Sequence, residues 1–288
     1  MKPIVYFSKK ITPQAIRKLF DLLEADLPGK VAIKVHSGEP GNQNFLKPEL
    51  WADVIRAVDG TVVECNTAYK GGRDTTQRHL ETFRQHGWSP RFPVDLLDAQ
   101  GPDLELAIPD GKKIQKNFVG KDITGYGSML VLSHFKGHPM GGFGGALKQL
   151  SIGVASGYGK KYIHGVGVTE NFWSSDHDSF LVAMADAAAS VTRFFHGKLA
   201  YINVMKNMSV DCDCCSVAED PCMGDIGILA SLDPVAIDQA CLDLVYASAD
   251  PGRDHLLERI ESRNGVHTIE AAAELGIGSR EYQLIAVE

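Results

Sequence analysis

Short apolar runs alternate with longer amphipathic stretches over the first third of the chain. Their length and apolar character are typical of buried strands at residues 4–7, 31–35 and 61–65. Thr12 and Pro13 precede residues 15–23, where apolar side chains recur at helical spacing, so we expect a capped helix there. Two further helices are predicted over residues 48–58 and 75–86. Strands that alternate with helices in this way usually build parallel βαβ units in layers.

The middle of the chain has a different pattern. Two short strand-like runs, residues 104–109 and 114–119, flank Asp110-Gly111, a dipeptide that favours a tight hairpin turn. Later runs predict strands at residues 129–133, 199–205, 226–230 and 282–287, and helices at residues 179–195 and 234–246. We therefore expect one α/β domain over residues 1–288. Its sheet should be mostly parallel or mixed, in a layered βαβ arrangement, with a small antiparallel hairpin insertion around residues 104–120.

Composition excludes several classes of protein. The formal net charge is −7 and hydrophobic residues make up 44% of the 288 residues, which argues against nucleic acid as the main partner and against disorder. No apolar run approaches the roughly 18 residues that span a bilayer, and the first residues turn polar too soon for a signal peptide. The six cysteines are too few and too clustered for a secreted disulfide scaffold. We expect a cytoplasmic protein with no nucleic-acid or membrane partner.

Four of the cysteines form the first candidate site. Cys212, Cys214, Cys215 and Cys222 fall within eleven positions. Alternate side chains of an extended segment point the same way, so the Cys212 and Cys214 sulfurs could reach one metal ion. Thiolates suit zinc or an iron–sulfur cluster, although the spacing is that of neither a zinc knuckle nor a ferredoxin. A disulfide or idle thiols in a loop are the alternatives.

A glycine-rich segment at residues 133–148 is the second candidate. It follows a predicted strand and leads into a predicted helix, the position where open α/β sheets bind ligands. Backbone amides at a helix N-terminus bind anions, and lysines would add charge. The residues with candidate roles are His134, Lys136, His138, Gly142, Gly144, Gly145 and Lys148. Two surface histidines in a flexible turn are the alternative interpretation.

Two further polar clusters belong to the same analysis. Residues 156–167 are rich in glycine and contain Lys160 and His164, a composition that suggests a second anion-contacting loop. Polar side chains also follow the second and third predicted strands, and in a parallel sheet they would share one edge with the glycine-rich segment. These are His36, Glu39, Asn42, Asn44, Asn66, Tyr69, Lys70, Arg73, Asp74 and His79.

Five segments in order resemble one family. Residues 34–42, 66–73, 134–148, 211–214 and 225–238 are similar to the DUF362 family, whose members often carry the label of an uncharacterised iron–sulfur centre protein. The resemblance covers nearly the whole chain but implies no established reaction. Many relatives carry a ferredoxin-like insertion after the segment that residues 159–164 resemble, whereas here residues 165–173 contain no cysteine. The histidine and glycine region is also similar to the nickel-dependent lactate racemase family, which implies a similar fold and site position.

Three functions are compatible with these features. In the first, the protein is a metal centre, an iron–sulfur or zinc site on the four cysteines, with a possible redox partner. In the second, it is an enzyme that acts on a small anionic substrate. Its acid–base or metal-binding groups would be His134, His138, His164 and Lys148, and its ligand-binding groups Lys136, Gly142, Gly144, Gly145 and Lys160. In the third, it is a non-catalytic ligand-binding module on an inherited fold.

Overall fold

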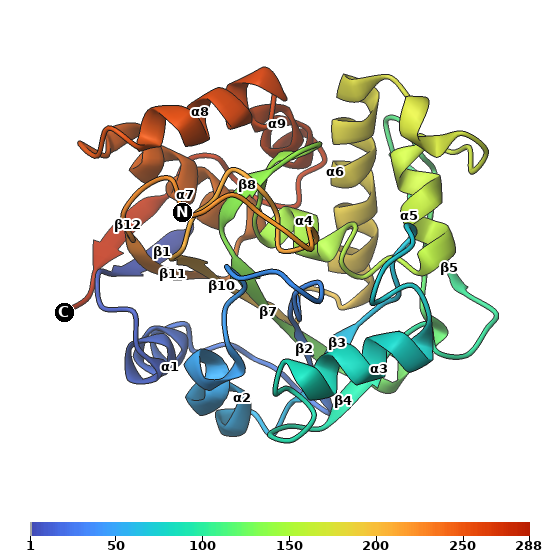
Figure 1. The fold of residues 1–288 in the computed structure, drawn as a ribbon, viewed down its shortest axis with the longest axis horizontal. Helices are drawn as coiled ribbons and strands as arrows, with labels where there is room; N and C mark the ends of the chain where they lie inside the picture. The colour runs from blue at the N-terminus through green and yellow to red at the C-terminus, as the bar shows by residue number, and fades with distance from the viewer. Residues whose placement is uncertain (1) are drawn as a thin grey trace.

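A central sheet of eight strands organises the chain, and the computed structural model describes residues 2–288. The strands are β1 (Ile4–Ser8), β2 (Val31–Lys34), β3 (Thr61–Glu64), β4 (Val94–Leu96), β7 (Ser128–His134), β10 (Leu199–Met205), β11 (Gly227–Ser231) and β12 (Gln283–Ala286). Their order across the sheet is β12-β1-β11-β10-β7-β2-β3-β4 (Figure 1). Neighbours from β10 to β4 run parallel, and β11 is antiparallel to both β1 and β10. The fold is therefore the mixed, mostly parallel α/β sheet that the sequence predicted.

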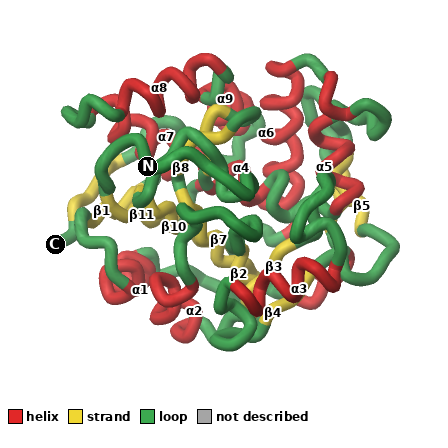
Figure 2. Tube along the Cα trace, in the orientation of Figure 1, coloured by secondary structure: helices red, strands yellow, loops and turns green. Residues whose placement is uncertain are grey.

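Helices cover both faces of this sheet (Figures 1 and 2). The α-helices are α1 (Pro13–Leu22), α2 (Ala52–Ala57), α3 (Thr76–Gln85), α4 (Ala146–Leu150), α5 (Gly157–His164), α6 (His177–Phe194), α7 (Pro234–Ala247), α8 (Arg253–Ser262) and α9 (Val266–Glu274). Short 3₁₀ turns are η1 (Pro48–Trp51), η2 (Lys121–Gly125) and η3 (Phe172–Ser174). The Thr12 side chain accepts a hydrogen bond from the Ala15 amide, so α1 begins at the predicted cap.

The hydrophobic cores on the two faces of the sheet follow the alternation of side chains along the strands. In β7, Met129 and Val131 pack with α4, α6 and α7, whereas Leu130 and Leu132 pack with α1 and α2 on the opposite face. Both faces are buried, which explains why the central strands read as continuous apolar runs. Lys34 breaks this pattern at the end of β2.

Two hairpins lie outside the main sheet. β5 (Leu104–Ala107) pairs antiparallel with β6 (Lys116–Val119), as predicted around Asp110-Gly111. A second hairpin, β8 (Lys136–His138) with β9 (Gly142–Gly144), was not expected, because three-residue strands leave no periodic signal. β4 was missed for the same reason.

Residues 157–164 form helix α5, and the expected glycine-rich loop was wrong there. The Ser156 hydroxyl caps this helix by accepting from the Gly159 amide, 2.9 Å away. Gly159 itself packs against the backbone of Phe118, where a Cβ would lie 2.0 Å from the carbonyl oxygen. Gly159 therefore serves the close packing of α5 against β6. Across residues 2–288, none of the helices combines the length and the apolar character needed to cross a membrane.

Candidate functional site

A cavity of about 260 Å³ lies at the carboxyl ends of β2, β3 and β7. The β8–β9 hairpin, α4 and α5 complete its walls. Since the three strands are parallel neighbours, their ends meet at one edge, as the sequence predicted for the polar clusters. Its titratable lining comprises Lys34, His36, Glu64, Cys65, Tyr69, Arg73, His134, Lys136, His138, Lys148, Lys160, His164 and Cys214.

One side of the cavity is a closed network of buried charges around Arg73. Its guanidinium donates to Glu39 at 2.9 Å and to Glu64 at 3.3 Å, and His79 contacts the same Glu64 oxygen at 2.6 Å. Burial alone would raise the pKa of Glu64. The His79 hydrogen bond and the Lys34 and Arg73 charges outweigh burial and hold that pKa well below its usual range. Each charge in this network is therefore compensated by a partner.

Lys136 and His134 share a second buried carboxylate. Asp213 lies 3.1 Å from Lys136 Nζ and 3.0 Å from His134 Nδ1, and the other ring nitrogen of His134 faces the Lys206 carbonyl at 2.6 Å. Burial alone would raise the pKa of Asp213, but the contacts with His134 and the charge of Lys136 outweigh burial and hold that pKa well below its usual range. Both nitrogens of His134 are engaged, so the ring fixes Asp213 and the cysteine segment that carries it.

Three lysines complete the cationic lining without such compensation. No carboxylate in residues 2–288 forms an ion pair with Lys34, Lys148 or Lys160. The ammonium of Lys160 donates to the carbonyls of Ala155 and Cys65. Burial lowers the pKa of both Lys34 and Lys160. An anion in the cavity would supply the missing negative charge.

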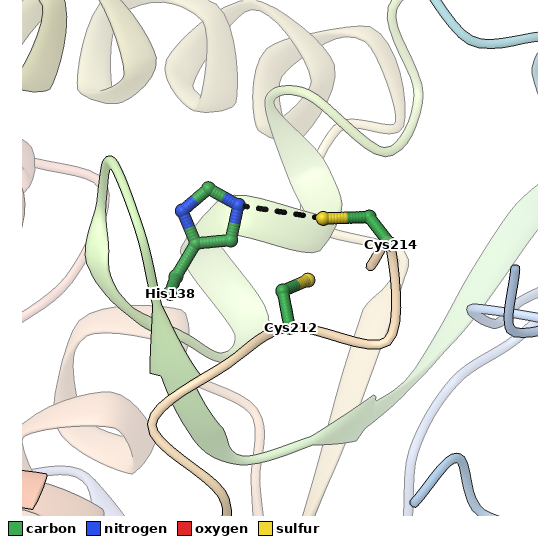
Figure 3. Close-up of side chains that lie close together, drawn as sticks. All are labelled: His138, Cys212 and Cys214. Atoms are coloured by element: carbon green, nitrogen blue, oxygen red, sulfur yellow. Dashed lines mark hydrogen bonds between the residues drawn. The ribbon is translucent and has the colours of Figure 1, made fainter. Parts of the chain in front are cut away.

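The cysteine segment and the histidine region meet at the cavity wall. The ligand atoms of His138, Cys212 and Cys214 all lie within 4.8 Å of one another, and Cys214 Sγ is 4.0 Å from His138 Nε2 (Figure 3). Burial lowers the pKa of His138 to about 4, so its ring is neutral, the form that ligates metals. This mixed group comes from β8 and from the loop between β10 and β11.

Hydrogen bonds from asparagine side chains attach the cysteine segment to the loop after β2. The side-chain amide of Asn42, in that loop, donates to the carbonyl of Cys215 at 2.8 Å. Asn44 reaches the Glu219 carbonyl at 2.7 Å. In Figure 1 the blue loop after β2 and the orange loop between β10 and β11 accordingly lie close together. The asparagines predicted as ligand-binding groups therefore brace the cysteine segment.

The other two cysteines of the predicted set lie outside this group. Cys222 Sγ donates to the Met208 carbonyl at 3.2 Å, away from the cavity. Cys215 follows Cys214 in a tight turn, and a hydrogen bond from the Cys214 thiol lowers its pKa. Within residues 2–288 the structure therefore groups two of the four predicted cysteines with a histidine, and it places Cys222 apart from them.

His164 presents a different kind of nitrogen to the cavity. Its Nδ1 donates to the Lys160 carbonyl at 2.7 Å, and its ring stacks on Phe180 with centroids 4.8 Å apart. Burial lowers its pKa to about 4. Nε2 therefore carries a lone pair, and within residues 2–288 it has no hydrogen-bond partner. This geometry is that of a proton acceptor.

The glycine-rich segment does not offer its helix N-terminus to a ligand. The amides of Ala146 and Leu147 at the start of α4 donate to the buried Asp238 carboxylate at 2.8 and 2.9 Å. A Cβ at Gly145 would lie 2.3 Å from Asp238 Oδ1. Gly144 and Gly145 line the cavity, whereas Gly142 packs against Gly265. The expected anion cradle at α4 is therefore wrong, because a side chain 92 positions away fills it.

Lys34 is one of the lining residues that the sequence interpretation missed. It lies within residues 31–35, which were predicted as a buried strand, and is only 2% exposed. A lysine in a fully buried parallel strand is unusual, since lysine is almost never fully buried. A lysine at a position predicted to be buried was the signal in the sequence that could have identified Lys34 as a candidate.

Comparison with known proteins gives a family and little more. Residues 31–243 match the family described as a domain of unknown function, DUF362. No curated protein sequence matches the chain.

Two solved structures are similar in outline. One is the lactate racemase apoprotein from Thermoanaerobacterium thermosaccharolyticum, with 16% identity, a TM-score of 0.45, and coverage of 69% of this chain and 50% of that one. The other is a protein from Thermotoga maritima, with 12% identity, a TM-score of 0.44, and coverage of 92% and 60%. This chain thus spans between 50% and 60% of the length of those two proteins. The family match includes β2, the cavity and the cysteine segment, and it confirms the resemblance found in the sequence: the chain belongs to the DUF362 family.

Proposed function

We propose that this protein is a metal-dependent enzyme that acts on a small organic anion. The observation that carries the proposal is that the possible metal ligands lie beside a cavity lined with cationic side chains. His138 and Cys214 belong to the three-residue donor group, and both also line the cavity that contains five cationic side chains. A metal ion and an anion could therefore occupy adjacent positions.

The donor set fits a borderline or soft metal such as zinc. Two thiols and one imidazole are typical zinc ligands, and catalytic zinc sites keep three protein ligands with a further position open. An iron–sulfur cluster normally uses four protein ligands, which favours a mononuclear ion here. When bound, such an ion would act as a Lewis acid toward an oxygen of the substrate.

Protons must move before a metal can bind. Hydrogen bonding with Cys214 and burial raise the pKa of Cys212, and the Cys214 pKa is raised as well, so both are thiols at neutral pH. The Met140 and Gly141 amides donate to His138 Nδ1 at 3.1 and 2.8 Å, which leaves the ring proton on Nε2. If His138 held a metal through Nε2, that proton would have to move to Nδ1, and both hydrogen bonds would be lost. We therefore expect the Met140–Gly141 turn to rearrange on loading.

The chain's own groups suit an anionic substrate. Lys148 and Lys160 form no ion pair with a carboxylate of the described residues, and they would hold a carboxylate or phosphate of the substrate. His164 Nε2, with its free lone pair, would accept a proton from the substrate. Lys136 and His134 fix Asp213, and with it the segment between the two cysteines.

Metal analysis of anaerobically purified protein tests the first half of the proposal. We expect about one equivalent of metal in the wild type, and almost none in a Cys212→Ser/Cys214→Ser variant. Cys222→Ser is the matched control, since its sulfur lies outside the donor group, and it should keep the metal. An iron-dependent visible absorption band would indicate that the site holds an iron–sulfur cluster instead of zinc. Equal metal content in wild type and double variant would refute the site.

A further inference from the structure

Lys34 holds a position in the cavity that neither metal binding nor folding explains. Side chains alternate along β2, so Lys34 projects from the same face as Ala32, toward α4. Its ammonium nitrogen contacts the Gln149 side-chain oxygen at 2.9 Å and the Val35 carbonyl. The residue is 2% exposed and lines the cavity.

The charges around Lys34 are mostly positive. Among the described residues, Glu64 is the carboxylate whose charge acts on Lys34, and it already bonds to Arg73, His79 and Ser37. Lys160 and Arg73 add positive charge, and Cys65 lies close by as a buried thiol. Burial is the largest influence, and it lowers the pKa of Lys34 to about 8. Roughly a tenth of the side chain is then a neutral amine at pH 7, compared with less than about a thousandth for an ordinary lysine.

We propose that Lys34 is a reactive amine that forms an imine with a small carbonyl-bearing anion, of which 2-oxo acids are the simplest class. Three features of the site support this: the nitrogen lies at the cavity wall, no carboxylate in residues 2–288 forms an ion pair with it, and the cations Lys160 and Arg73 lie near it. Desolvated lysines beside other cations are known to be activated in this way. The neighbouring Lys160 would hold the carboxylate of the same molecule.

The chemistry needs no other reactant. The lone pair of Nζ attacks the carbonyl carbon, and the carbonyl oxygen takes up the proton that the nitrogen loses. A second proton, from solvent, lets this hydroxyl leave as water, and a protonated imine remains. Water reverses the reaction. Gln149 and the Val35 carbonyl orient the amine by accepting its hydrogen bonds.

The proposal rests on the anion-binding half of the proposed function and not on the metal. It can be tested by incubating the whole protein with pyruvate and sodium cyanoborohydride, which reduces an imine to a stable amine, and mapping the label by peptide mass spectrometry. We expect labelling of Lys34 at least about tenfold above exposed lysines such as Lys9, because ordinary amines are almost fully protonated at neutral pH. Acetaldehyde, which lacks the carboxylate, should label Lys34 less than pyruvate does.

Two variants separate the outcomes. Cys212→Ser/Cys214→Ser should keep the Lys34 label even though it loses the metal, and Lys34→Arg should lose it while folding normally by circular dichroism. Because the label is mapped on the wild type, the test does not depend on Lys34→Arg being stable. If pyruvate raises the melting temperature but Lys34 stays unlabelled, the imine is refuted and anion binding stands. If pyruvate neither binds the protein nor labels Lys34, both imine formation and anion binding are refuted.

Discussion

Two groups of charged side chains, buried or half-buried, face the same cavity and differ in one respect. Around Arg73, each charge has a partner: Glu39, Glu64 and His79 bond to the guanidinium or to one another. Lys34, Lys148 and Lys160 have no carboxylate partner in residues 2–288. Burying an unpaired charge costs free energy, and folding alone gives no reason to keep it. The paired group supports the fold, and the unpaired group is suited to a ligand.

The largest expected effect is a loss of stability when one partner of the paired group around Arg73 is removed. Arg73→Leu leaves Glu39 and Glu64 buried without their cation, so we expect the free energy of unfolding to fall by about 3–5 kcal/mol. Urea denaturation measures it. Arg78→Leu on α3 is the control, because Arg78 is exposed and its pair with Asp74 should contribute less than about 1 kcal/mol. Similar losses in both variants would remove the distinction between the two groups.

The cysteine side of the cavity should respond most strongly to pH. Two thiols with raised pKa values must each lose a proton to bind a metal, so apparent zinc affinity should fall on the order of a hundredfold for each pH unit of acidification. Competition with a chromophoric chelator, measured at several pH values between pH 6 and pH 8, would show this slope. Cys222→Ser should follow the wild type. An affinity independent of pH would exclude thiolate ligation.

Asp238 links the scaffold to the unpaired group, because it bonds to the helix that carries Lys148. It holds the start of α4, which carries Lys148, and burial raises its pKa to about 6. Because the folded pKa lies above the unfolded value, the folded state binds this proton more tightly, and stability gains as pH falls through 6. Compared with Asp238→Asn, the wild type should gain about 2 kcal/mol between roughly pH 7.5 and pH 4.5. Parallel urea titrations of both proteins at the two pH values would detect the gain. No difference would mean that Asp238 titrates normally.

The smallest expected effect is confined to binding. Lys148→Met should weaken pyruvate or phosphate binding by about tenfold or more, and change the free energy of unfolding by less than about 1 kcal/mol. Calorimetry and urea denaturation give the two quantities. Lys161→Met on α5 is the matched control, since Lys161 is half-buried like Lys148 but lies outside the cavity lining. A loss of stability comparable with that of Arg73→Leu would show that Lys148 is also structural.

The site was only partly predictable. His138, Cys212 and Cys214 were candidates because their residue types bind metals, and residues 134–148 were placed correctly after a strand. The roles of the glycines were not predicted, because the Asp238 carboxylate accepts the hydrogen bonds of the amides at the start of α4. Nor was Lys34, because its burial depends on α4 packing over β2.

Local pattern determined most of the strands and helices, the β5–β6 hairpin and the mixed α/β class, because periodicity and capping act within a few residues. The family resemblance also came from the sequence alone. Only the tertiary structure decided which side chains meet. His138 and Cys214 are 76 positions apart, and Lys34 and Gln149 are 115 apart. Their contacts depend on the sheet order β10-β7-β2-β3, which differs from chain order and so is not written in any local stretch.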